Sequence, residues 1–300
     1  MPQEFLIAVG AGLGGMLGWG LSDFFAKKTI DRIGDTVSLA WGHIFGTLAL
    51  ILMVLYRVFA QDVAFTWPQG MNPWLLVIIF GIGQAAVYLF VYKGFGKGQV
   101  GVLNPIFASF TGITAILSIL IFKEPVNLFM IVGLIIIFIG VILLSVDLKA
   151  LRARQISFAH VPGFKEVIIA TFLAAIWTLL WDKVVGGKDW LSYTLCMYAI
   201  MTVAIIAYAK LMKIKLALTN PGKAIWIYLF LIGFCEVIAY LAISLGYSST
   251  TYTSIIAVLS GAFSLPVIVL ARIFLKEKIT RAQTIGSIVV ILGIVFLFLI

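Results

Sequence analysis

Charged residues are scarce in this sequence. They make up 11% of its 300 positions, whereas 63% of the positions are hydrophobic and the mean hydropathy is +1.16. A soluble domain carries about 25% charged residues, so this chain lacks the polar side chains that would cover a globule in water. The shortage indicates that lipid is its solvent. The net charge of +9 does not point to nucleic acid, because the Lys and Arg residues are confined to short gaps between apolar runs.

Cysteine, histidine and the common catalytic motifs are also nearly absent. Only two cysteines occur, Cys196 and Cys235, and each lies inside an apolar run, which argues against a disulfide framework. There is no HExxH motif, no pair of intramembrane aspartates and no GxxxxGKS/T loop. We therefore expect neither an intramembrane enzyme nor a self-contained ATP-driven pump, and no cofactor or metal site.

The apolar runs predict an all-α integral membrane protein. The first run opens with "MPQEF" and lacks a basic start, so we expect a retained helix rather than a cleaved signal peptide. Runs long enough to cross a bilayer and bounded by charges, Gly or Pro recur along the whole chain. They predict ten transmembrane helices at 4–26, 37–57, 74–95, 99–122, 127–146, 165–185, 190–210, 224–246, 251–275 and 282–300.

The distribution of positive charge predicts the orientation. Alternate connections, starting with the first, hold 17 of the 21 Lys and Arg residues. Positive residues concentrate on the cytoplasmic side of a membrane protein. We therefore expect a multi-pass protein of the cell (inner) membrane with both termini outside. The segment 147–164 is expected to be a cytoplasmic linker against anionic lipid headgroups.

The two halves of the chain resemble each other. A shift of 152 places Trp74, Gly81, Tyr88 and Gly94 on Trp226, Gly233, Tyr240 and Gly246, and a shift of 153 places Lys123-Glu124 on Lys276-Glu277. Five helices is an odd number, so the second copy, 165–300, must be inverted relative to the first, 1–146. Inverted repeats are typical of secondary transporters, whose substrate site lies near the bilayer midplane between the repeats.

Three features carry a family resemblance. They are "LSDFFAKK" after a Trp-Gly in the first helix, Pro105 in "VLNPIFASF", and a Lys-Glu turn before a Gly-containing helix, which occurs in both halves. With these features the chain resembles a ten-helix transporter of the drug/metabolite transporter superfamily, built from two EamA domains. The resemblance implies transport of small organic solutes through a cavity between helices 1–4 and 6–9. Pro105 corresponds to Val258 and Pro266 to Ile113, so we expect the halves to kink differently.

The stretch "GAGLGGMLGWG" in the first helix is rich in glycine. Gly10, Gly14 and Gly18 recur every four residues on one helix face, and Gly12 and Gly15 widen it. Lipid gives helices no hydrophobic reason to associate, so small residues that allow close backbone approach take that role. The pattern predicts a close-packing face, which is compatible with a face that moves during transport.

One acidic residue lies at the centre of a predicted helix. Glu236 is flanked by apolar residues on both sides, and its repeat equivalent is Gln84. Tyr240 and Tyr88 follow each of these by four residues, on the same helix face. A charge at the bilayer centre is costly and marks a functional site. We expect these four residues to cluster. Glu236 either binds the coupling proton or a substrate amine, or it is a structural carboxyl group.

Other polar and aromatic residues are weaker candidates. Trp19, Trp177 and Asn104 are candidate substrate contacts, and Asp23, His43 and Asp182 are candidate gating residues near the two mouths. Asp23 and His43 could pair between the first two helices, but Asp23 could equally pair with Lys27 at the headgroups. Ser22, Lys93 and Tyr198 are possible cavity liners.

The sequence therefore predicts a carrier for a small organic solute such as an amino acid, coupled to protons and working by alternating access. The alternatives are a sugar or drug facilitator without proton coupling, and a channel or non-transporting membrane scaffold. Its expected partners are the solute, membrane lipid and protons, with no nucleic acid, and the protein would be a monomer or a homodimer.

Overall fold

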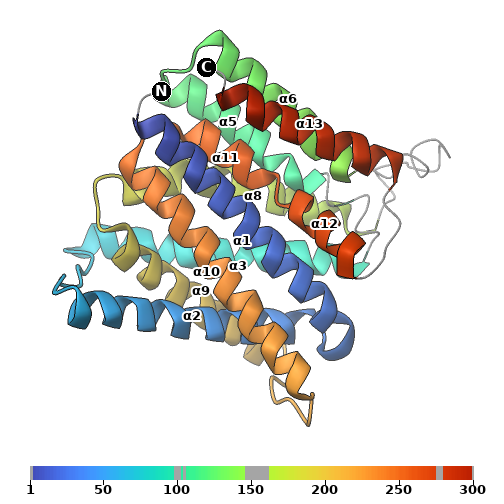
Figure 1. Cartoon of the computed structure of the whole chain (residues 1–300). Helices are drawn as coiled ribbons and strands as arrows, with labels where there is room; N and C mark the ends of the chain where they lie inside the picture. Colours follow the sequence, from blue (N-terminus) through green and yellow to red (C-terminus); the bar gives the residue numbers. More distant parts are fainter. Residues whose placement is uncertain (1–2, 98–102, 104–105, 146–161, 275–279, 299–300) are drawn as a thin grey trace.

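The computed structural model describes residues 3–97, 103, 106–145, 162–274 and 280–298. Every regular element in these ranges is a helix, and together they form one bundle (Figure 1). The helices are α1 (Gln3–Ile33), α2 (Asp35–Ala60), α3 (Met71–Lys97), α5 (Phe110–Phe122), α6 (Leu128–Ser145), α8 (Phe164–Val185), α9 (Trp190–Leu211), α10 (Lys223–Ser249), α11 (Thr253–Gly261), α12 (Ser264–Phe274) and α13 (Arg281–Phe298).

The described chain forms the ten membrane spans that the sequence predicts. Seven spans are long apolar helices, and three shorter apolar helices, Ile106–Phe122, Leu128–Leu144 and Arg281–Leu297, complete the set. The start of α1 and the end of α13 lie at the same end of the bundle, as an even number of crossings requires (Figure 1). We call this the termini end and the opposite end, where Gly34 joins α1 to α2, the Gly34 end.

The span predicted at 251–275 is divided into two helices. The division falls at Ala262 and Phe263, between α11 and α12. Pro266 causes it, because proline has no N–H group and its ring collides with the carbonyl group four residues earlier. That carbonyl, on Ala262, instead accepts a hydrogen bond from the N–H group of Leu265 at 2.9 Å. Ser109, the repeat equivalent of Ala262, is likewise a turn, directly before α5. The expected difference in kinking is therefore not seen at these positions, and Pro105 lies outside the described residues.

Helix bounds reproduce the internal repeat. Both ends of α3 and α10 differ by 152 residues, and both ends of α6 and α13 differ by 153. Packing follows the same relation: α1 packs on α10 as α8 packs on α3, and α2 packs on α10 as α9 packs on α3. The repeat equivalents α6 and α13 pack directly on each other. The fold is therefore a pair of inverted repeats about a pseudo-twofold axis.

Glycines bring α1 close to its neighbours. A Cβ atom on Gly18 would lie 2.6 Å from the carbonyl oxygen of Cys235 in α10, and one on Gly14 would lie 2.6 Å from the Cβ atom of Ala242. Gly12 instead faces α11, and Gly15 lies between the two helices, since a Cβ atom there would lie 2.8 Å from Ser260 in α11 and 2.9 Å from Ile243 in α10. The predicted close-packing face is thus two adjacent faces. Gly10 was wrongly included, because a Cβ atom there would meet nothing within 4 Å.

A second glycine contact joins α2 to α10. A Cβ atom on Gly233 would overlap the carbonyl oxygen of Gly42 and the backbone nitrogen of Gly46. His43 lies between these two α2 glycines, and Glu236 lies one turn beyond Gly233 on α10. The backbone contact therefore determines which polar side chains meet at the centre of the bundle.

Alanine at two glycines of α1 should have opposite effects. Gly18→Ala forces α1 away from α10, and such overpacking costs about 1–3 kcal/mol of folding free energy. Gly10→Ala is the matched control, since it adds a methyl group in open space and gains up to about 1 kcal/mol of helix propensity. Thermal unfolding in detergent should show a lower Tm for Gly18→Ala and an unchanged or higher Tm for Gly10→Ala. Equal Tm values would contradict the packing role of Gly18.

Candidate functional site

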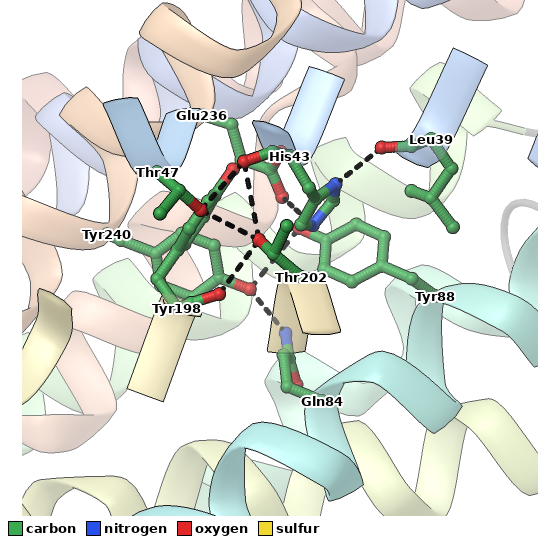
Figure 2. Close-up of polar contacts among 9 residues, drawn as sticks. All are labelled: Leu39, His43, Thr47, Gln84, Tyr88, Tyr198, Thr202, Glu236 and Tyr240. Carbon is green, nitrogen blue, oxygen red and sulfur yellow. Dashed lines mark hydrogen bonds and ion pairs between the residues drawn. The ribbon is translucent and has the colours of Figure 1, made fainter. Parts of the chain in front are cut away.

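Polar side chains from several helices meet at the centre of the bundle (Figure 2). Glu236 lies at the midpoint of α10 and is 3% exposed. We call the group around it the central cluster. Its members are His43 and Thr47 from α2, Gln84 and Tyr88 from α3, Tyr198 and Thr202 from α9, and Glu236 and Tyr240 from α10.

Both oxygens of Glu236 have a partner residue. The hydroxyl group of Tyr198 donates a hydrogen bond to Oε2 at 3.0 Å. Nε2 of His43 lies 3.4 Å from Oε1, and both side chains are buried. The geometry of this second contact is that of an ion pair without a formed hydrogen bond, since Nε2 and Oε1 both lack a hydrogen-bond partner among the described residues.

The other ring nitrogen determines the tautomer of His43. Nδ1 lies 2.9 Å from the carbonyl oxygen of Leu39, which can only accept a hydrogen bond, so Nδ1 carries the proton. A neutral His43 then turns the lone pair of Nε2 toward a carboxylate oxygen. Two buried lone pairs face each other unless one further proton lies between them.

Gln84, Tyr88 and Tyr240 form the other side of the cluster. The amide nitrogen of Gln84 donates to the hydroxyl group of Tyr240 at 2.7 Å, and that hydroxyl lies 3.4 Å from the hydroxyl of Tyr88. Figure 2 shows these side chains directed toward Glu236 and His43. The structure thus brings together the four residues that the repeat alignment paired, while their role in transport stays a prediction.

The cluster contains a further pair of repeat equivalents. Thr47 and Thr202, 155 positions apart, share a hydrogen bond at 2.8 Å. Each hydroxyl also bonds the carbonyl oxygen four residues earlier, on His43 and on Tyr198. The rings of His43 and Tyr198 stack at 5.1 Å with an interplanar angle of 13°. The histidine and the tyrosine that contact Glu236 are therefore equivalent positions of the two repeats.

Two tryptophans flank the cluster. Trp19 from α1 and Trp177 from α8 each make an edge contact with the ring of Tyr240, at 5.9 and 6.1 Å. The indole nitrogen of Trp177 donates to the carbonyl oxygen of Phe80 at 2.9 Å. That of Trp19 has no partner among the described residues. Both predicted aromatic contacts thus lie at the cluster, and Trp19 retains a free donor.

The cluster leaves several buried polar atoms without hydrogen bonds within the described residues. They are Nε2 of His43, Oε1 of Glu236, Oε1 of Gln84 and Nε1 of Trp19. An unsatisfied buried polar group costs about 1–3 kcal/mol, so such atoms are rare without a reason. Two acceptors, one donor and one protonatable nitrogen together fit a small polar ligand. No group of three metal-binding side chains was found among the described residues.

The remaining predicted residues lie elsewhere. Asp23 is exposed and lies one turn from Trp19 on α1, toward the Gly34 end. One of our expectations was that Asp23 pairs with His43. In the structure the partners of His43 are instead Glu236 and Leu39. The side chain of Lys27, the other expected partner of Asp23, and all of Asn104 are outside the described part of the chain. Asp182 is at the termini end, away from the cluster.

A cavity opens at the Gly34 end below the cluster. Its volume is about 270 Å³, and its lining residues are Asp35, Thr36, Leu39, Leu89, Tyr92, Lys93, Lys97 and Tyr208. Leu39 is the residue whose carbonyl oxygen contacts His43, and the ring of Tyr92 lies 6.4 Å from that of Tyr88. Leu39 and Tyr92 thus connect the cavity to the central cluster.

Sequence reasoning missed the main partners of Glu236. Tyr198 was only a possible cavity liner, and Thr47 and Thr202 were not considered. A shift of 155 between α2 and α9 aligns both pairs, but the alignment relied on the shifts of 152 and 153. Loop lengths differ between the repeats, so one shift cannot find every equivalent pair.

The fold is that of a multi-pass membrane protein. A family model, the EamA-like transporter family, matches residues 6–146 and 163–299. The chain belongs to this family, which confirms the resemblance drawn from the sequence. A solved structure described as "Crystal structure of protein" is similar to this chain with a TM-score of 0.77 and 14% sequence identity. The match covers 97% of this chain and 96% of that chain. At this identity the similarity supports the fold alone. No curated protein matches the chain.

The partners of Glu236 predict how its substitution affects stability. Glu236→Leu leaves the hydroxyl group of Tyr198 buried without an acceptor, which costs about 1–3 kcal/mol. Glu236→Gln keeps an acceptor oxygen in the same place and should cost less. Thermal unfolding in detergent should therefore give a lower Tm for Glu236→Leu than for Glu236→Gln. The reverse order would mean that the hydrogen bond from Tyr198 contributes little.

Proposed function

We propose that the protein is a proton-coupled carrier of a small amine-bearing solute, such as an amino acid, with its central site at Glu236 and His43. The first repeat, 1–146, and the second, 165–300, would expose this site alternately to the two sides of the membrane. The linker 147–164 would join them in the cytoplasm. Membership of a transporter family supports the general class, and the central cluster supports the specific mechanism.

The contact between Glu236 and His43 is the observation that carries the proposal. Oε1 and Nε2 are 3.4 Å apart, both are buried, and the contact of Nδ1 with Leu39 leaves no proton for Nε2 in the neutral ring. A buried acid in a membrane helix faces either a partner or a pathway. Here the acid and its partner together lack one proton, so the site takes it up or exchanges it for another cation.

An ammonium group is the cation that fits the rest of the cluster. It can donate hydrogen bonds to Oε1 of Glu236 and Oε1 of Gln84, the two acceptors without partners among the described residues. The aromatic residues Trp19 and Tyr88 both contact Tyr240 at the cluster, and aromatic faces attract cations by about 0.5–2 kcal/mol. The free indole N–H group of Trp19 can donate to a solute oxygen. Solute and proton then compete for Glu236, which couples their movements.

Access from the Gly34 end supports alternating exposure. The cavity there reaches Leu39 and Tyr92, next to the cluster, and the exposed carboxyl group of Asp23 lies on the same face of α1 as Trp19. At the termini end, Arg57 of the first repeat pairs with Asp189 of the second through bonds of 2.6 and 2.7 Å. This ion pair would separate when that end opens.

Transport in proteoliposomes tests the proposal. Counterflow of amino acids, sugars and nucleosides should give saturable exchange for an amine-bearing solute, and an imposed proton gradient should drive its accumulation. Glu236→Gln removes the proton site but keeps the size of the side chain. Its gradient-driven accumulation should fall to the level of empty liposomes.

The control is Glu4→Gln, which removes an exposed carboxyl group of the same helix bundle and should leave accumulation unchanged. Saturable exchange that is independent of pH in the wild type and in Glu236→Gln would favour a facilitator for a sugar or drug. If no solute gives saturable exchange, a channel or a scaffold becomes the better description.

Cysteine labelling in intact cells tests the expected orientation. On a background without Cys196 and Cys235, a membrane-impermeant maleimide should label Gln69→Cys, in the connection between α2 and α3, from outside. Thr219→Cys, in the connection between α9 and α10, should react only after permeabilisation. Both positions are exposed in the structure. The opposite labelling pattern would place the termini in the cytoplasm and contradict the charge argument.

A further inference from the structure

Two buried carboxyl groups lie at the termini end. Glu124, in the connection between α5 and α6, is 7% exposed, and Asp182, in the last turn of α8, is 6% exposed. The carboxyl group of Glu124 accepts hydrogen bonds from the backbone N–H group of Ser254, at 3.0 and 3.2 Å, and from its hydroxyl group at 2.5 Å. Ser254 is the second residue of α11, so Glu124 caps the positive end of that helix.

A buried tyrosine faces the same two acids. The hydroxyl group of Tyr247 on α10 has no hydrogen-bond partner within the described residues. It lies within electrostatic range of both Asp182 and Glu124. A phenol can donate one hydrogen bond and accept others, so the hydroxyl oxygen of Tyr247 is able to accept a hydrogen bond from a neutral carboxyl group. We call Glu124, Asp182, Tyr247 and Ser254 the outer acid site.

The outer acid site joins the two repeats. Glu124 belongs to the first repeat, whereas Asp182, Tyr247 and Ser254 belong to the second. The ammonium group of Lys183 lies 3.5 Å from Asp182 and 3.8 Å from the centre of the ring of Phe122 in α5. The contact of Lys183 with Phe122 is therefore a second contact between the two repeats at this site. Opening of the termini end would move Glu124 from this enclosed position into water.

We propose that the outer acid site binds a proton from the solution at the termini end and that the bound proton holds this end of the carrier closed. This inference rests on the proposed carrier function, but its site, its residues and its proton are different from those of the central cluster. The relevant chemistry is the cost of burying an ionised carboxylate beside a second acid.

The direction of the effect follows from the environment of Glu124. Burial raises the pKa of Glu124 from 4.5 to about 7, although the hydrogen bonds from Ser254 oppose the shift; Asp182 raises this pKa and Lys183 lowers it. Asp182 and Lys183 from α8 and Tyr247 from α10 are the titratable groups that face it among the described residues. In the open state, water would return the pKa to its ordinary value.

Because the raised pKa belongs to the closed state, protonation favours closure. The contribution is complete below about pH 4.5 and is lost as the pH rises through about 7. Between these values the ratio of closed to open molecules falls by up to about tenfold per pH unit. From pH 5.5 to pH 8 the ratio should fall by about 30-fold.

Double electron–electron resonance spectroscopy tests this on the full chain in lipid nanodiscs without solute. Spin labels at Leu128→Cys, at the start of α6, and Ser249→Cys, at the end of α10, report the separation of the repeats at the termini end. Both positions are exposed, and the buried Cys196 and Cys235 are replaced by alanine. The population with the longer distance should grow between pH 5.5 and pH 8.

Variants identify the group that titrates. Glu124→Gln should remove the pH response, and Glu4→Gln, an exposed acid at the same end, should keep it. Ser254→Ala removes a hydrogen bond that lowers the pKa of Glu124, so the midpoint should move to higher pH. Ser254→Ala also tests whether Glu124 is the titrating group if Glu124→Gln does not fold.

Three results would overturn the proposal: a distance distribution that does not change with pH, a pH response that survives Glu124→Gln, and a response that disappears in Glu236→Gln. The last result would assign the titration to the central cluster. The experiment needs no solute, so failure of the transport assay leaves it valid, and failure here leaves the central site intact.

Discussion

The close contact of α10 with α1 and α2 is the constraint on which the rest of the structure depends. Lipid offers no hydrophobic gain for helix association, so backbones must approach closely to gain dispersion energy. Gly18 provides this approach on one side of α10, and Gly42, Gly46 and Gly233 provide it on the other. These contacts bring the backbones of α2 and α10 together where His43 meets Glu236. The position of the central cluster is therefore a consequence of these glycines, which have no side chain to keep the backbones apart.

The pseudo-twofold axis brings equivalent positions together, but their chemistry differs. Gln84 stands where the other repeat has Glu236, and Tyr198 stands where the first repeat has His43. A symmetric pair of acids at this depth would repel, because each charge would be desolvated beside a like charge. Gln84 has an amide where the other repeat has the acid, and Tyr198 has a phenol where the other repeat has the imidazole. The cluster therefore contains one acid, Glu236, and one base, His43. The fold thus supplies a symmetric arrangement of helices, and the residue differences place a single buried acid next to a single histidine.

Local sequence patterns predicted the spans and the residues that lie on one helix or on its repeat equivalent. Hydropathy located the ten spans, and the shift of 152 paired Glu236 with Gln84 and Tyr240 with Tyr88. Contacts between unrelated helices were not predictable. His43 and Glu236 are far apart in the sequence, and only the crossing of α2 and α10 decides that they meet. The contact of Glu124 with Ser254 was hidden for the same reason, since the Lys-Glu motif was used only as a repeat marker.

One face of α10 connects the two acid sites. Glu236, Tyr240, Ser244 and Tyr247 follow each other at steps of four, four and three residues, and all of them are buried. Such spacing places their side chains in a row along the helix. Ser244 accepts a hydrogen bond from the indole nitrogen of Trp181 at 3.1 Å, and Trp181 stacks on Trp177. The row therefore runs from the central cluster to the outer acid site past the two tryptophans of α8. A proton bound at Glu124 and one bound at Glu236 would lie at opposite ends of this polar row, so the proposed closure at the termini end and the proposed loading of the centre would act through a single helix.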